Sequence, residues 1–181
     1  MKKLIIAATL AAATVVAPMA HAENENLTKF GDIAQIGVPL TAGAIALWKG
    51  DGEGFFQLAE GALYTAAATH TLKLAVDAER PDGSANNSFP SGHTSAAAQG
   101  AAFLQFRYGW EYGLPAYAVS AVVGYSRVQA DRHYWRDVAA GAVLATGVQY
   151  AVTKMGYSMT NIALAPYVNG DEVGLYASMQ F

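Results

Sequence analysis

The chain has 181 residues, which is enough for one domain with a substantial core. It is 53% hydrophobic and only 14% charged, its formal net charge is −3, and it has no basic run that would indicate a nucleic-acid-binding protein. No cysteine is present, which excludes disulfide bonds, thiolate nucleophiles and zinc–thiolate sites.

Residues 1–22 are predicted to be a signal peptide. Lys2 and Lys3 precede an apolar run at residues 4–16, which is shorter than the roughly 20 residues of a membrane-spanning helix. The sequence Ala-His-Ala at residues 20–22 fits the pattern of small residues at a cleavage site. We therefore expect export, most simply to a bacterial periplasm, with an uncleaved anchor as the alternative.

The rest of the chain is predicted to be all-α, a helical bundle of about five helices at residues 23–157. The expected helices cover residues 29–48, 55–76, 93–108, 114–128 and 134–155, and Pro39 is expected to kink the first of them. Small residues recur along the last helix, where they allow close packing between helix backbones.

Residues 158–181 are predicted to form a C-terminal β-hairpin. Two runs of alternating apolar residues flank Asn169-Gly170, and this dipeptide is a strong hairpin signal. Two strands cannot close a barrel. We therefore expect the hairpin to cover the helical body.

Three polar clusters interrupt the apolar helices, each at a junction where one helix ends or the next begins. In an up-and-down bundle these junctions lie at the same end, so their side chains are expected to share one pocket. The clusters are Lys73 with Arg80-Pro81, then Pro90-Ser91-Gly92-His93, and finally the stretch from Ser126 to Asp137, which includes Arg127 and His133.

The predicted pocket suits a tetrahedral oxyanion. Lys73, Arg80 and Arg127 supply positive charge, and arginine forks match the oxygens of a phosphate group. Ser91 and Gly92 lie at a helix start, where free backbone N–H groups favour an anion. The three cations would repel Mg²⁺ or Zn²⁺, so we predict no metal site.

The two histidines of the pocket have different neighbours in the sequence. His133 and Asp137 are four residues apart, which places them on one face of a helix, about 6 Å apart along its axis. Asp137 can accept from one ring nitrogen and leave the other free to attack, which makes His133 the better nucleophile. His93 has no carboxylate in register and is the better general acid. Pairs such as His133–Asp137 also occur in purely structural networks.

The order Lys-x6-Arg-Pro, Pro-Ser-Gly-His and Ser-Arg-x5-His-x3-Asp resembles that of the type-2 phosphatidic acid phosphatase and vanadium haloperoxidase superfamily, over roughly residues 55–155. The resemblance implies that His133 forms a phosphohistidine, that Asp137 orients it, and that His93 protonates the leaving alkoxide and later activates water. It implies no metal or other cofactor in the phosphatase branch. It also implies phosphate-binding roles for Lys73, Arg80, Ser91, Gly92 and Arg127, whereas Ser126 is expected only to pack or cap.

These patterns favour an exported phosphatase acting on phosphomonoesters or diphosphates, with lipid phosphates as the leading substrates. A vanadate-dependent haloperoxidase is one alternative, although the chain is short for the larger bundle of those enzymes. A non-enzymatic protein that binds phosphate or a lipid headgroup is another, although simple binding needs only the cations. The sequence does not indicate an oligomeric state.

The sequence is compatible with both a soluble periplasmic protein and an integral membrane protein, and it favours the first. Glu60 and His70 interrupt the second predicted helix, and several apolar runs are short, which favours a soluble periplasmic protein. The Gly- and Ala-rich helices and the low charge also permit an integral membrane protein whose site faces the periplasm.

Overall fold

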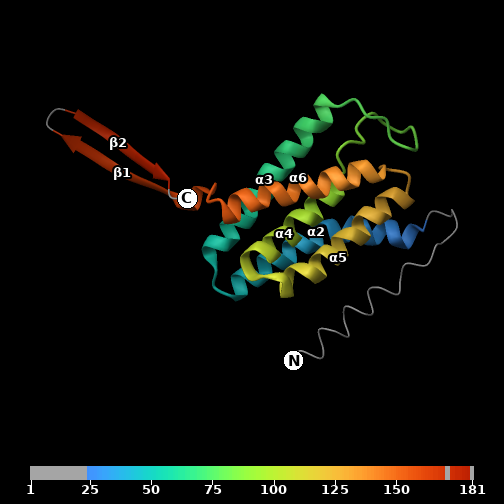
Figure 1. Cartoon of the computed structure of the whole chain (residues 1–181), viewed down its shortest axis with the longest axis horizontal. Coiled ribbons are helices and arrows are strands. Elements are labelled where there is room, and N and C mark those ends of the chain that lie inside the picture. Colours follow the sequence, from blue (N-terminus) through green and yellow to red (C-terminus); the bar gives the residue numbers. More distant parts are fainter. Residues whose placement is uncertain (1–23, 170–171, 180–181) are drawn as a thin grey trace.

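The computed structural model describes residues 24–169 and 172–179 (Figure 1). The predicted signal peptide lies outside the described residues, as do Gly170 of the predicted turn and the last two residues. The described residues contain five α-helices: α2 (Glu25–Trp48), α3 (Gly52–Ala75), α4 (Gly92–Tyr108), α5 (Trp110–Gln129) and α6 (Trp135–Lys154). A short 3-10 helix, η1 (Met159–Asn161), leads to strands β1 (Ile162–Asn169) and β2 (Glu172–Met179). The predicted fold class, an all-α bundle with a C-terminal hairpin, is confirmed.

Three of the helices begin at a side-chain cap. Asn24 accepts from the N–H of Leu27, Asp51 from that of Gly54, and Ser91 opens α4 in the same way. Such caps satisfy N–H groups that have no partner within the helix. The caps at Asp51 and Ser91 thus determine where α3 and α4 begin.

The central helix is α4, which contacts α2, α3, α5 and α6 (Figure 1). Its buried residues include Ala97, Ala98, Ala101 and Ala102, with Phe103 and Leu104 near its C-terminal end. The small side chains allow close contact between helices. A Cβ on Gly100 would lie 2.8 Å from backbone atoms of Pro39, so α4 and α2 can approach this closely only at a glycine. α2 is assigned as one helix through Pro39.

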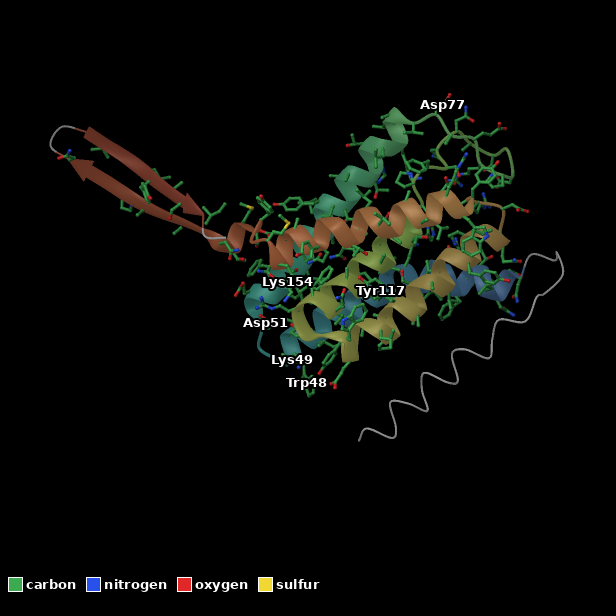
Figure 2. All side chains as sticks on the ribbon, in the orientation of Figure 1. Trp48, Lys49, Asp51, Asp77, Tyr117 and Lys154 are labelled. Carbon is green, nitrogen blue, oxygen red and sulfur yellow. The ribbon has the colours of Figure 1, made fainter. Side chains whose placement is uncertain are left out.

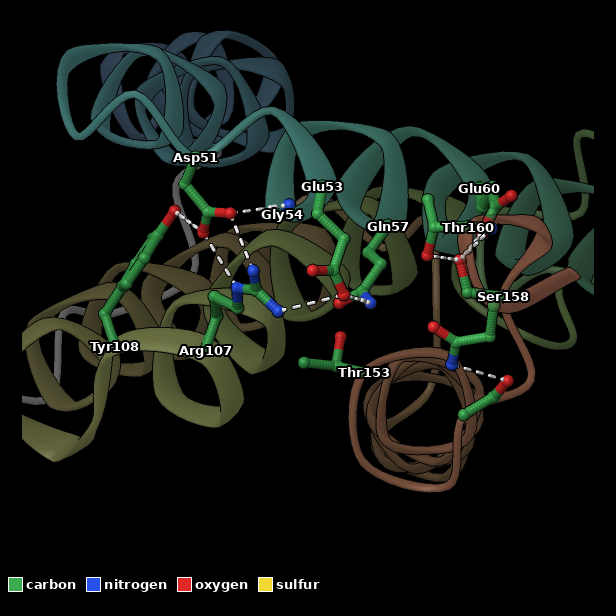
Figure 3. A network of polar contacts seen from close by, with 12 residues as sticks. Asp51, Glu53, Gly54, Gln57, Glu60, Arg107, Tyr108, Thr153, Ser158 and Thr160 are labelled. Carbon is green, nitrogen blue, oxygen red and sulfur yellow. Dashed lines mark hydrogen bonds and ion pairs between the residues drawn. The ribbon is translucent and has the colours of Figure 1, made fainter. Parts of the chain in front are cut away.

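The end of the bundle far from the loop between α3 and α4 is held by a polar network (Figures 2 and 3). Asp51 accepts two hydrogen bonds from Arg107, at 2.8 and 2.6 Å, and one from the hydroxyl of Tyr108 at 2.8 Å. Arg107 holds the pKa of Asp51 well below its usual range. The network joins the start of α3 to the end of α4. None of its residues belongs to the predicted pocket, so we regard it as structural.

The C-terminal hairpin does not cover the helical body, and that prediction is wrong. Strands β1 and β2 pair with each other in an antiparallel, two-stranded sheet, and they extend away from the helices (Figure 1). The segment before the hairpin is fastened to the bundle, where Glu60 accepts from the Ser158 hydroxyl at 2.6 Å and from the Met159 N–H at 3.0 Å (Figure 3). The alternating pattern predicts the strands but does not predict what they contact.

Candidate active site

The first part of the site lies at the junction between α5 and α6. α6 begins at Trp135, so His133 lies just before the helix and Asp137 lies in its first turn. Both side chains are buried. Asp137 Oδ2 accepts from the N–H of Tyr134 at 2.9 Å and lies 3.8 Å from Nδ1 of His133. This last separation is an ion-pair distance and is too long for a direct hydrogen bond.

Ser88 lies between these two side chains. Its hydroxyl donates to Asp137 Oδ2 at 2.5 Å, and its oxygen lies 3.4 Å from His133 Nδ1. A neutral imidazole can therefore donate its Nδ1–H toward Ser88 and keep the Nε2 lone pair free. The expected direct hydrogen bond between His133 and Asp137 is thus replaced by a contact through Ser88. No feature of the sequence separates Ser88 from the other polar residues of its loop.

The environment of His133 keeps its imidazole neutral over most of the pH range. Burial, followed by the positive charges of Lys73 and Arg80, lowers the pKa of His133 to about 4, and the charge of Asp137 opposes this shift. The neutral ring is the form that can act as a nucleophile.

Two of the predicted phosphate-binding cations donate hydrogen bonds to the same loop residue, Asn87. Lys73 Nζ donates to the carbonyl of Asn87 at 2.6 Å, and Arg80 Nε donates to the side-chain oxygen of Asn87 at 3.0 Å. Burial and the charge of Arg80 lower the pKa of Lys73, and the charge of Asp137 raises it. A Cβ on Gly92 would lie 3.9 Å from Lys73 Cε, so this side chain passes beside the start of α4.

The start of α4 supplies Ser91 and Gly92. Ser91 is fully buried, and its oxygen accepts from the N–H of Thr94 at 3.4 Å. The N–H of Ser91 donates to the carbonyl of Asp137 at 2.9 Å, which ties α4 to α6. The N–H groups in the first turn of a helix lack an intrahelical partner and lie at the positive end of the dipole. Those of Gly92 and His93 can therefore bind an anion.

His93 has a carboxylate partner, contrary to the prediction from sequence. Its Nε2 lies 3.0 Å from Oδ1 of Asp32, which belongs to α2. Burial and the charge of Arg127 lower the pKa of His93, and the hydrogen bond and charge of Asp32 raise it. The prediction considered neighbours in sequence only, whereas Asp32 lies 61 residues before His93.

The same carboxylate oxygen binds Arg127. Arg127 Nη1 donates to Asp32 Oδ1 at 2.6 Å, Nη2 donates to the carbonyl of Thr28 at 2.7 Å, and Nε donates to Ser126 Oγ at 3.0 Å. Arg127 is only 4% exposed. Gly31 leaves room for it, because a Cβ there would lie 2.7 Å from Nη2. Ser126 is fully buried, which agrees with the packing role expected for it.

Arg80 connects the two parts of the site. Its positive charge contributes to lowering the pKa of both His93 and His133, after burial and the charges of Arg127 and Lys73, respectively. The predicted site residues thus gather at one end of the bundle, at the three junctions that the sequence singles out. The structure adds Asp32, Asn87 and Ser88. Among residues 24–169 and 172–179, no group of three or more His, Cys, Asp or Glu side chains could hold a metal ion.

Comparison with known proteins places these residues in a family. The family model described as "PAP2 superfamily" matches residues 54–159. A lipid A 4'-phosphatase of Helicobacter pylori is 31% identical over 159 residues, which cover 82% of this chain and 79% of that protein. A lipid A 1-phosphatase of Porphyromonas gingivalis is 39% identical over 87 residues, which cover 46% of this chain and only 18% of that protein. No solved structure matches the chain.

The matched region contains the three motifs at the helix junctions and ends just after α6, whereas Asp32 lies outside it. Both of these similar proteins are named as phosphatases, which are hydrolases. The resemblance seen in the motifs is therefore confirmed, and the chain belongs to the PAP2 superfamily as an enzyme of its phosphatase class.

Proposed function

We propose that the chain is an exported, metal-independent phosphatase that removes phosphate from lipid phosphates through a phosphohistidine on His133. The observation that carries the proposal is a buried, neutral imidazole backed by Ser88 and Asp137 and flanked by Lys73 and Arg80. The similarity to two proteins named as lipid A phosphatases supports a lipid substrate.

In the proposed first step, Nε2 of His133 attacks phosphorus and the bond to the leaving alkoxide breaks. The ring becomes positively charged as the phosphorus–nitrogen bond forms, and Asp137 stabilises that charge, with Ser88 between them. Lys73, Arg80, Arg127, Ser91 and the Gly92 N–H hold the phosphoryl oxygens, whose charge they offset in the transition state.

The proposed proton donor to the leaving oxygen is His93. With Nε2 held by Asp32, the nitrogen that can face the substrate is Nδ1. In the second step the same ring takes a proton from water as that water attacks the phosphohistidine. Inorganic phosphate then leaves and His133 is restored.

We also propose that the exported chain associates with a membrane through the exposed apolar face of α2. Among the described helices, α2 is the one that is long and apolar enough to cross a membrane, although core helices and signal sequences pass the same test. Ile33, Ile36, Leu40 and Leu47 are exposed at spacings that place them on one face of this helix. Exposed apolar faces of this kind are typical of interaction sites for membranes or other proteins.

A phosphate-release assay on fractionated cells tests both proposals. We expect membranes to release phosphate from lipid phosphates in the presence of EDTA, to be inhibited by orthovanadate, and to retain the activity after carbonate extraction. The His133→Ala chain is the matched control for other phosphatases in the fraction. Complete loss of activity in EDTA would contradict the metal-independent mechanism, and recovery of all activity in the soluble fraction would contradict membrane association.

The two histidines predict an acidic optimum for kcat/KM. His133 must be neutral, which holds above its pKa of about 4, and His93 must be protonated, which holds below its own pKa. Because the pKa of His93 lies below the ordinary value of 6.5, we expect kcat/KM to peak between about 4 and 6.5. In the Asp32→Asn variant the descending limb should move to lower pH, because this change removes the carboxylate that raises the pKa of His93.

The control for this measurement is Glu25→Gln, which removes an exposed carboxylate of the same helix that pairs with Lys29. Its pH profile should match that of the unmodified chain. An Asp32→Asn profile with both limbs in place would show that Asp32 does not act on His93 during turnover.

A further inference from the structure

The segment from the end of α3 into the loop before α4 carries two positive charges that are not paired with a carboxylate. Lys73 lies in the last turn of α3, and Arg80 follows it in the loop. Within the described residues, neither side chain forms an ion pair with a carboxylate. The arginines that do form such a pair are Arg107, Arg127, Arg132 and Arg136. Burial, and after it the charge of Arg80, lowers the pKa of Lys73, so the two cations disfavour each other and need another restraint.

Asn87 restrains both cations through two different oxygens. Its backbone carbonyl accepts from Lys73 Nζ at 2.6 Å, and its side-chain Oδ1 accepts from Arg80 Nε at 3.0 Å. Hydrogen bonds from charged donors are roughly twice as strong as those between neutral groups. Both oxygens are neutral, so the cations are held in place and keep their full charge for an anion.

The hydrogen bond to Asn87 uses one nitrogen of Arg80 and leaves the two terminal ones. An arginine side chain has donors on Nε, Nη1 and Nη2. In the part of the chain that the structure describes, Nη1 and Nη2 of Arg80 make no hydrogen bond, whereas all three nitrogens of Arg127 do. Two terminal nitrogens in one plane match two oxygens of a phosphoryl group. The contact at Nε therefore restrains the guanidinium and leaves this fork available.

Asn87 is in turn fixed by the backbone of its own loop. It pairs with Ala78 in a parallel bridge, and the N–H of Ser88 donates to the carbonyl of Ala78 at 2.9 Å. Ser88 is also the residue whose hydroxyl donates to Asp137 and whose oxygen lies 3.4 Å from His133 Nδ1. Two consecutive residues, Asn87 and Ser88, therefore link the cations to the pair of His133 and Asp137.

We propose that Asn87 is a positioning residue, which fixes Arg80 and Lys73 in the arrangement around His133 that a bound phosphoryl group requires. It acts through the two cations and does not itself contact the substrate. The proposal rests on the function proposed above and deepens it, because it names the residue that arranges two phosphate-binding cations. It also gives a reason for an amide at this position. An aspartate would accept the same hydrogen bonds, but its negative charge would repel the phosphate.

The first test removes the side-chain acceptor of Arg80. Asn87→Ala keeps the backbone carbonyl that binds Lys73 and deletes the side-chain oxygen. We expect the dissociation constant for orthovanadate, a phosphate analogue, to rise roughly tenfold in calorimetry on the full chain in detergent, and kcat/KM for nitrophenyl phosphate to fall by a similar factor. The control is Asn86→Ala, at an exposed neighbour in the same loop, which should change both values by less than about twofold.

The second test uses charge to separate positioning from a purely structural role. Asn87→Asp has nearly the same shape and keeps an acceptor for Arg80, so its thermal unfolding temperature should not fall below that of Asn87→Ala. Its added negative charge should nevertheless weaken orthovanadate binding roughly tenfold more than Asn87→Ala does. If Asn87 only stabilised the loop, the aspartate would restore both stability and binding.

A double-mutant cycle identifies the cation through which the side chain of Asn87 acts. Asn87→Ala should weaken orthovanadate binding in the unmodified chain, but by less than about twofold in the Arg80→Ala chain, because the side chain that it positions is then absent. Independent effects that multiply in the double variant would contradict the proposal. Circular dichroism of all variants establishes that they are folded.

Calorimetry and turnover distinguish this proposal from the proposed function. If the unmodified chain releases phosphate but Asn87→Ala or Asn87→Asp binds orthovanadate as tightly as it does, the role of Asn87 is wrong and the proposed phosphatase stands. If the variants bind orthovanadate as expected but the unmodified chain turns over no phosphate ester, the role of Asn87 stands and the proposed function is wrong. If the unmodified chain neither binds orthovanadate nor turns over an ester, both are wrong.

Discussion

Replacing His133 with alanine is expected to lower kcat by a factor of roughly 10⁴ or more for every phosphate ester. In the proposed mechanism the variant loses the atom that forms the bond to phosphorus. His133 is buried and neutral, so its removal should affect stability far less than the loss of a buried ion pair would. The measurement is initial rate against ester concentration, with thermal unfolding recorded alongside.

Trapping the intermediate gives this prediction a second readout. Acid-labile, base-stable radiolabel on the chain after brief mixing with labelled substrate would identify a phosphohistidine, and we expect none in His133→Ala. The control is His70→Ala, which removes another imidazole near the site and should still acquire the label. Labelling of the His133→Ala chain would assign the nucleophile to a different residue.

The candidate site residues could be predicted because their motifs lie at helix junctions, although His133 lies just before α6 and so does not share a helix face with Asp137. Each of the three motifs lies at a helix end, and an antiparallel bundle brings alternate helix ends together, so Lys73, His93 and His133 are expected at the same end of the bundle. The bundle itself could be predicted from the apolar periodicity of its helices. Composition and periodicity therefore supply the fold class and most of the candidate site.

Contacts between distant segments were less predictable. Asp32 is the one acidic residue between Lys29 and Trp48, in an otherwise apolar helix, and a lone carboxylate there needs a partner. That signal indicates that Asp32 has a partner, but it does not identify His93 and Arg127 as the partners. Ser88 gives no signal at all, because its role depends on how the loop before α4 folds over α6.

The hairpin shows the same limit at the level of elements. Alternation and the Asn169-Gly170 dipeptide fix the strands and their pairing, because both are local. Where a hairpin lies depends on complementary surfaces elsewhere in the molecule. The apolar character of the strands alone was therefore not enough to predict that they extend away from the helices. In the described part of the chain, the strands pair from Ile162↔Met179 to Asn169↔Glu172 in a sheet of two strands.

Replacing His93 with alanine is expected to affect substrates according to their leaving groups. Alkyl phosphates must release a strongly basic alkoxide, so loss of the proton donor should slow phosphorylation of His133 by roughly 10²–10⁴-fold. Nitrophenyl phosphate releases a stable phenolate that needs no proton, so its phosphorylation step should be slowed much less. The measurement is the single-turnover rate for each ester, which isolates this step from hydrolysis of the intermediate.

The second role of His93 predicts a distinct kinetic pattern in the same variant. In the proposed mechanism His93 also activates water, so the phosphohistidine should persist after nitrophenyl phosphate has reacted. We then expect a burst of one nitrophenol per chain followed by a slow steady state, and the burst should be absent from the unmodified chain. Because Asp32 contacts His93 Nε2 at 3.0 Å, Asp32→Asn should show the same bias between the two esters in weaker form. Equal losses for the two esters, without a burst, would mean that His93 only binds phosphate, and the proton would then have to come from another group at this junction.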